Sequence, residues 1–155
     1  MTRAISLTRR AMLRAALLFS ASCGLITGTD EEHEDDLRDA ERRWSQAAIQ
    51  DYQIVVQQLC FCGYTRPVRV TVRSGNIVSR VDADTGEPVP PQGEHVRDVR
   101  GLFDLIRDAI KRDAYSLAVT YDGTFGFPTQ INIDYIGNAI DDELVVKTSE
   151  FQRMR

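Results

Sequence analysis

Three cysteines are the residues of this sequence best suited to chemistry. Cys60 and Cys62 close a stretch from Tyr52 to Gly63 that alternates like a β-strand, and Cys23 lies much earlier in the chain. Paired thiols can form a disulfide, cycle as a redox couple or bind a soft metal as thiolates. The spacing of Cys60 and Cys62 favours some of these three uses over others.

A bridge between Cys60 and Cys62 requires the strand to end or bulge at this point. In a regular strand, residues i and i+2 stand about 7 Å apart along the chain, whereas a disulfide needs Cβ atoms within about 4.5 Å of each other. Gly63 follows directly and permits such a break. We therefore predict a structural disulfide at the end of the strand, with a metal site or a redox-active pair as the alternatives.

Both alternatives lack supporting residues. A metal site needs about two more soft ligands, and the only histidines, His33 and His95, lie in segments with the composition of loops. A redox role is disfavoured because CxC lacks the two-residue spacing and the helix start of a thioredoxin site. The sequence predicts no metal and no other cofactor.

Catalytic motifs do not occur in the rest of the sequence. There is no GxSxG or HExxH motif, neither histidine has a recognisable serine or cysteine partner, and the glycines are scattered singly. Asp82–Glu87 is similar to part of a calcium-binding loop, but it lacks the distal bidentate glutamate, so a turn rich in Asp and Gly explains it. Asp141-Asp142-Glu143 is interpreted as a charged strand entry. We expect a protein without enzymatic activity.

Residues 1–22 have the composition of a signal peptide. Four arginines precede a short apolar run, Ala15 to Phe19, and no acid occurs before Asp30. The run is too short to span a bilayer as a permanent anchor. Thr8–Arg14 resembles a twin-arginine export signal, and general secretory export is the alternative. We expect the mature chain to leave the cytoplasm.

Cys23 is the predicted site of lipidation. Ser20–Gly24 is similar to a bacterial lipobox, in which the cysteine becomes the lipidated first residue, although Ser20 stands where the pattern has leucine. Lipidation would also leave Cys60 and Cys62 as an even pair in an oxidising compartment. We expect a protein of the periplasm or cell surface that is anchored to a membrane through a lipid on Cys23.

The charge of the mature part restricts its partners. The whole chain has a formal net charge of −4, and removal of residues 1–22 takes away four arginines and no acids, which leaves −8. This charge argues against nucleic acid and against electrostatic binding to anionic lipid. Six acids lie from Asp30 to Asp36, so residues 23–36 are interpreted as an acidic flexible tether. A cation site that involves His33 is the alternative.

Residues 37–151 are predicted to form one α+β domain. A helix from Leu37 to Ala48 has one apolar face, on which Trp44 belongs to the core or marks a pocket. A second helix is capped by Asp98 and carries a continuous apolar stripe from Val99 to Ile110. Three strands follow each helix, which predicts an antiparallel sheet of about six strands with both helices packed on one face. The expected strands are Tyr52–Cys62, Val68–Arg73, Ile77–Ala83, Leu117–Tyr121, Gln130–Tyr135 and Leu144–Thr148.

Several local motifs resemble a known family. They include Trp44 in the first helix, the CxC at the end of a strand, the segment LFDLIRDAI, and the signature Tyr121-Asp122 followed by Gly126-Phe127-Pro128 and Ile131. Over roughly residues 40–146 the chain is similar to a family of uncharacterised bacterial lipoproteins, known as a domain of unknown function. The resemblance implies an exported bacterial protein, and it implies no activity.

We expect a non-enzymatic module that binds an unknown envelope protein or a small ligand. The turn with Phe125, Phe127 and Pro128 places apolar groups between two strands, and it is predicted to meet the partner unless Phe127 folds back onto the core. The uncovered face of the sheet is a second candidate surface. The alternative is a metal-binding or thiol-redox protein that acts through Cys60 and Cys62.

Overall fold

The computed structural model describes residues 30–139 and 142–154. The predicted signal peptide (residues 1–22) and the predicted lipidation site Cys23 lie outside the described residues, as does Asp141 of the charged strand entry. Neither helix within the described ranges is long and apolar enough to cross a membrane.

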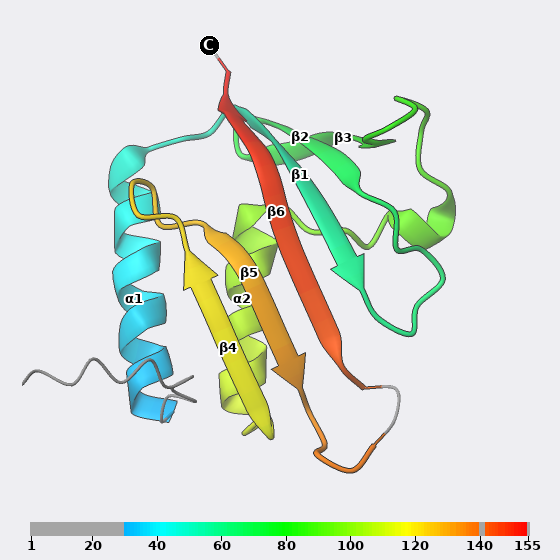
Figure 1. The fold of residues 1–155 in the computed structure, drawn as a ribbon. Coiled ribbons are helices and arrows are strands. Elements are labelled where there is room, and N and C mark those ends of the chain that lie inside the picture. Colours follow the sequence, from blue (N-terminus) through cyan, green and yellow to red (C-terminus); the bar gives the residue numbers. More distant parts are fainter. Residues whose placement is uncertain (1–29, 140–141, 155) are drawn as a thin grey trace, which may run out of the picture.

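The described elements follow the order helix, three strands, helix, three strands, which confirms the predicted α+β class. The strands form one six-stranded antiparallel sheet, in the order β3-β2-β1-β6-β5-β4 (Figure 1). The elements are α1 (Asp30–Ala47), β1 (Tyr52–Leu59), β2 (Val68–Arg73), β3 (Asn76–Asp82), the 3₁₀ helix η1 (Pro91–Gly93), α2 (Val99–Lys111), β4 (Ser116–Tyr121), β5 (Pro128–Asp134) and β6 (Leu144–Arg153).

The two halves of the chain are similar in element order but not in position. β1, the first strand of the first half, lies at the centre of the sheet beside β6, whereas β4, the first strand of the second half, lies at an edge. Equivalent strands therefore occupy different environments, and the repeated order does not reflect two equivalent units.

Helix α2 forms where its apolar stripe and its cap predict it. The Asp98 side chain accepts a hydrogen bond from the Gly101 N–H at 2.9 Å, which satisfies one of the free amides of the first turn. The apolar residues of the stripe from Val99 to Ala109 are buried, and Ile110 is partly buried. Burial of this continuous stripe against the sheet supplies the stability that a helix of this length lacks by itself.

Helix α1 begins at Asp30, seven residues earlier than Leu37, where the sequence places its start. The predicted flexible tether over residues 23–36 is therefore wrong for residues 30–36, which are helical. Asp30 and Glu31 lie in the first turn, where carboxylates interact favourably with the helix dipole. Arg38 also pairs with Asp35 at 2.6 Å, one turn apart. Leu37 is the first buried residue and not the first helical one.

Both helices pack on the same face of the sheet, as predicted (Figure 1). On β2, Val68, Val70 and Val72 are fully buried while the residues between them are partly exposed, which is the expected period of two. The Tyr52 hydroxyl oxygen accepts a hydrogen bond from the Val99 N–H at 3.2 Å and so joins the start of β1 to the start of α2. Burial raises the pKa of the Tyr52 hydroxyl well above its usual range, so this group stays protonated.

Aromatic rings fill one end of this core. The Trp44 ring makes edge contacts with Tyr52 at 5.3 Å and with Phe151 at 5.9 Å, and Phe127 stacks on Phe151 at 4.5 Å between ring centroids. Trp44 is thus a packing residue of the core, which is the first of the two interpretations made from the sequence. A positive φ of 48° at Glu150 accompanies a register shift in β6 opposite Gln53 to Val55.

Candidate functional site

The bridge between Cys60 and Cys62 is present at the end of β1. The strand ends at Leu59, so both cysteines lie outside the regular ladder, with their Cα atoms 5.2 Å apart and their sulfurs bonded. The Cys62 N–H donates to the Cys60 carbonyl oxygen at 2.8 Å, which closes a three-residue turn inside the disulfide ring. The predicted disulfide is confirmed, and so is the expectation that the strand stops to permit it.

Phe61 stands at the tip of this turn and is the most exposed large apolar residue that the structure describes. Its side chain is 85% exposed, and Leu59 beside it is 39% exposed. The expected strand Tyr52–Cys62 does not by itself indicate that Phe61 stands away from the sheet. The signal that was missed is the CxC spacing itself: once the two outer residues turn to bond each other, the middle side chain is turned away from them.

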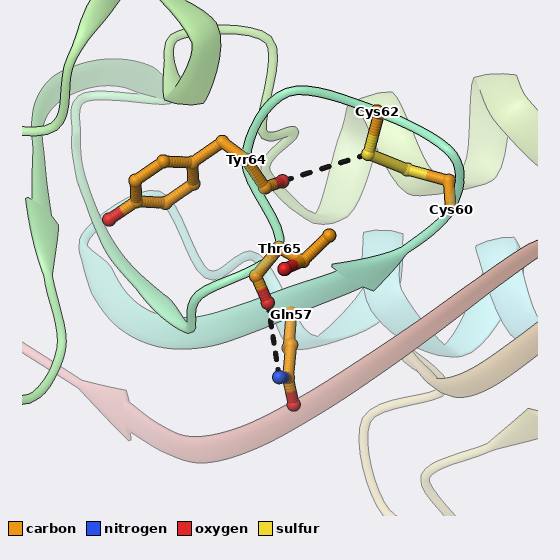
Figure 2. The surroundings of a disulfide bond; sticks show 5 residues. All are labelled: Gln57, Cys60, Cys62, Tyr64 and Thr65. Atoms are coloured by element: carbon orange, nitrogen blue, oxygen red, sulfur yellow. Dashed lines mark hydrogen bonds between the residues drawn. A yellow bond between two sulfur atoms is a disulfide. The ribbon is translucent and has the colours of Figure 1, made fainter.

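Contacts with neighbouring backbone hold the turn in place. Gln57 donates from its side-chain amide to the Thr65 carbonyl oxygen at 3.1 Å, across the loop that follows the disulfide (Figure 2). Cys62 Sγ lies 3.7 Å from the Tyr64 carbonyl oxygen. A bridged sulfur carries no proton, so in the disulfide form this is a contact and not a hydrogen bond.

The Asp82 carboxylate anchors the same loop to the end of β3. It accepts hydrogen bonds from the Tyr64 hydroxyl at 2.9 Å and from the Arg66 guanidinium at 2.5 and 3.1 Å. The backbone N–H groups of Asp84 and Thr85 each donate to its Oδ1 atom at 3.0 Å. These donors, with Arg66 first among them, hold the pKa of Asp82 well below its usual range. Because Asp82 is buried and therefore held in place, its bonds to Tyr64 and Arg66 fix the loop that follows Cys62.

The same network explains Asp82–Glu87 without a metal. Gly86 has a φ of 76° and its N–H donates to the Asp82 carbonyl oxygen at 2.8 Å, which makes a closed turn. Both oxygens of the Asp82 carboxylate accept hydrogen bonds from protein groups. The turn interpretation made from the sequence therefore agrees with the observed geometry.

The predicted contact turn folds onto the core. Phe127 is only 6% exposed and Pro128 less than 2%, while Phe125 is partly buried against Phe151 at 5.7 Å. The reason is that Gly126, with a φ of 83°, turns the chain tightly against α1, next to the Ala40 carbonyl. The structure thus places these side chains in the core, against the prediction that they form an exposed contact surface.

His33 lies beside a hollow between α1 and β4 with a volume of about 120 Å³. Within residues 30–139 and 142–154, no three histidine, cysteine or acidic side chains are grouped so that they could hold a metal ion. The cation site that involves His33 therefore gains no support. The hollow is lined by Glu32, His33, Asp36, Ile106, Ala118, Val119 and Tyr121.

The sheet face opposite the helices is polar. Gln53 donates to the Thr71 hydroxyl at 3.0 Å, and Arg69 pairs with Glu150 at 2.8 Å. These side chains bond to one another, as is usual on the solvated face of an antiparallel sheet. This part of the second candidate surface therefore carries paired polar and charged side chains, whereas the end of the sheet where Phe61 lies exposes a large apolar side chain.

The described residues form a small α+β domain with an exposed, disulfide-closed turn at the end of β1. The chain belongs to a family of unknown function, DUF6174, whose model matches residues 36–153. This match begins within α1 and ends at the last residue of β6, so it spans the whole sheet. No curated protein and no solved structure matches the chain.

Proposed function

We propose that this chain is an exported bacterial envelope lipoprotein that works as a non-enzymatic binding module. The leader over residues 1–22 and the lipobox-like Ser20–Gly24 support export and a lipid on Cys23. The turn that presents Phe61 is its contact surface. The observation that carries the binding role is the 85% exposure of Phe61 on a closed, anchored turn.

An exposed phenylalanine on a rigid turn is suited to contact. The disulfide and the Cys62-to-Cys60 hydrogen bond limit the backbone states of the turn, so little further entropy is lost when a partner binds. A large aromatic side chain also buries much apolar area for few rotatable bonds. A flexible polar loop would offer neither advantage.

The rival proposal is a thiol-redox protein, and it rests on the partly exposed bridge between Cys60 and Cys62. The two proposals differ in the residue on which they depend. If the protein binds through Phe61, Phe61→Ser abolishes its contacts and leaves the disulfide intact. If it acts by thiol exchange, Phe61→Ser retains the activity, and Cys60→Ser with Cys62→Ser removes it.

The anchoring part of the proposal is tested by expression of the full chain in a bacterial host. We expect the protein in the membrane fraction, with the N-terminal peptide beginning at Cys23 and carrying the mass of a lipid. Cys23→Ala is the control, and we expect it to stay unlipidated. An unmodified Cys23 in the wild-type protein, or a chain that remains in the cytoplasm, contradicts the proposal.

The binding part is tested by a photo-crosslinking amino acid in place of Phe61 in growing cells. The matched control carries the same group in place of Val78, which is 59% exposed on the edge strand β3. We expect adducts from the position of Phe61 and few from that of Val78. Equal yields from both positions would show that Phe61 is merely exposed.

A further inference from the structure

We propose that the partner of the Phe61 turn is the lipid bilayer itself, which this end of the domain touches when the chain is anchored. The inference rests on the proposed lipid on Cys23. If the lipid is there, the end of the domain at which α1 begins is the end nearest the bilayer. Three observations support it: the position of the exposed apolar residues, the start of α1, and the short chain between Cys23 and Asp30.

Four of the five exposed large apolar side chains among the described residues lie at one end of the sheet, and Val78 is the exception. β1 and β5 end there and β4 begins there, because neighbouring strands are antiparallel (Figure 1). Phe61 follows β1, Ile136 follows β5 and Tyr115 precedes β4, with exposures of 85%, 62% and 72%. The Tyr115 ring lies against Gly137, so Tyr115 and Ile136 are neighbours. We call Leu59, Phe61, Tyr115 and Ile136 the apolar rim.

The chain enters the domain at this same end. Figure 1 shows the start of α1 level with the start of β4 and the end of α2. Asp30 and Lys111 line one surface hollow, and Lys111 is four residues before Tyr115. The first helical residue therefore lies toward Tyr115, at one side of the apolar rim, and the far end of α1 lies about 27 Å away for its 18 residues.

The length of chain before Asp30 limits where the domain can be. Cys23 is seven residues from Asp30, and seven residues span at most about 25 Å when fully extended. An anchor at Cys23 thus keeps the apolar rim near the bilayer, whereas Val78 and the Ser74–Gly75 turn lie toward the opposite end, beside Gln50 and Asp51. Tethering raises the local concentration of lipid at the rim, so a weak contact suffices.

Phenylalanine and tyrosine are well suited to the interface of a bilayer, where an apolar ring meets polar headgroups. The charges nearby determine which lipids fit. The hollow beside Asp30 is lined by as many bases as acids, but the chain from Cys23 carries a net charge of −8, so anionic headgroups are repelled. The contact is therefore apolar, and it is stronger on zwitterionic lipid than on anionic lipid at low salt.

The test uses the chain from Cys23 to Arg155, which contains every described residue. With Cys60 and Cys62 bridged, Cys23 is the single free thiol and couples to maleimide lipid in vesicles of phosphatidylcholine. Three variants, Phe61→Trp, Tyr115→Trp and Val78→Trp, each add one reporter to the constant emission of Trp44. Brominated phosphatidylcholine, which quenches tryptophan within the bilayer, is the probe.

We expect bromolipid to quench the added emission of Phe61→Trp and Tyr115→Trp and to leave that of Val78→Trp unchanged. Replacement of part of the lipid by phosphatidylglycerol should reduce the quenching at low salt, and added salt should restore it. Equal quenching of all three variants, or none, overturns the inference.

The artificial tether separates this inference from the proposed function. If Cys23 is not lipidated in cells but the two rim reporters are quenched, then the lipoprotein proposal fails while the apolar rim still binds lipid. If Cys23 is lipidated but the rim reporters are not quenched, then only the inference about the bilayer fails. A denaturation curve for each variant confirms that it is folded.

Discussion

The Tyr64 hydroxyl donates a hydrogen bond to the Asp82 carboxylate at 2.9 Å, which joins the loop after the disulfide to the end of β3. Arg66 donates to the same carboxylate. Because Tyr64 is only two residues from Cys62, these bonds fix the position of the turn that presents Phe61. The exposed turn therefore depends on a buried carboxylate at the end of a different strand.

Loss of the Tyr64 hydroxyl should loosen this loop. We expect Tyr64→Phe to lower the free energy of unfolding by about 1 kcal/mol, the net value of one such hydrogen bond. Tyr115→Phe is the matched control, because Tyr115 is 72% exposed and should change stability by less than about 0.5 kcal/mol. Urea denaturation measures both. Equal effects of the two variants would show that the Tyr64–Asp82 bond contributes nothing.

Asp82 should make stability depend on pH in acid. Hydrogen bonds from Arg66 and the turn lower the pKa of Asp82 in the folded state, so its contribution is fully present above the usual aspartate pKa of about 4 and is lost as pH falls below it. The stability difference between wild type and Asp82→Asn should therefore shrink from pH 6 to pH 2. Asp84→Asn, at an exposed aspartate, should show no such change. A difference that stays constant with pH contradicts the assignment.

The disulfide should contribute little to global stability. A ring that closes only three residues restricts the unfolded chain slightly, so Cys60→Ser with Cys62→Ser should lower the free energy of unfolding by at most about 2 kcal/mol. The larger effect should be local, as faster amide exchange from Phe61 to Tyr64. In the native protein, a thiol reagent should react with neither Cys60 nor Cys62 before reduction and with both after it. Two reactive thiols at these positions before reduction would falsify the bridge.

Two glycines in one turn should differ in their response to alanine. At Gly126 the φ is 83° and an added Cβ would collide with the Ala40 carbonyl, so we expect Gly126→Ala to cost about 2 kcal/mol or more. At Gly123 nothing lies within 4 Å of an added Cβ, so Gly123→Ala should be nearly neutral. Thermal unfolding of both variants tests the tight approach of this turn to α1. Similar melting temperatures would contradict it.

The regular part of the fold could be predicted because it follows local periodicity. The stripe from Val99 to Ile110 and the alternation of Val68, Val70 and Val72 depend only on which residues must be buried. The start of α1 could not be found in this way. Its first turns carry no buried residue before Leu37, and their stability comes from charges near the helix start.

The candidate site was predicted only in part. Strand geometry alone required β1 to end before a Cys60–Cys62 bridge could form, and that expectation was correct. The exposure of Phe61 follows from the disulfide-closed turn, whereas the burial of Phe127 follows from tertiary packing, which the sequence does not reveal. Both are aromatic residues in turns, but only Phe127 has the aromatic cluster around Phe151 to pack against.

The end of the domain with Phe61 is covered by a partner in the envelope if the proposed function is right. Hydroxyl-radical footprinting measures this most directly, because it compares the unmodified protein in native membranes with the purified protein. The account predicts that labelling of Phe61 falls several-fold in membranes while labelling of Val78, exposed on the edge strand β3, stays the same. Equal labelling of Phe61 in both preparations would contradict it.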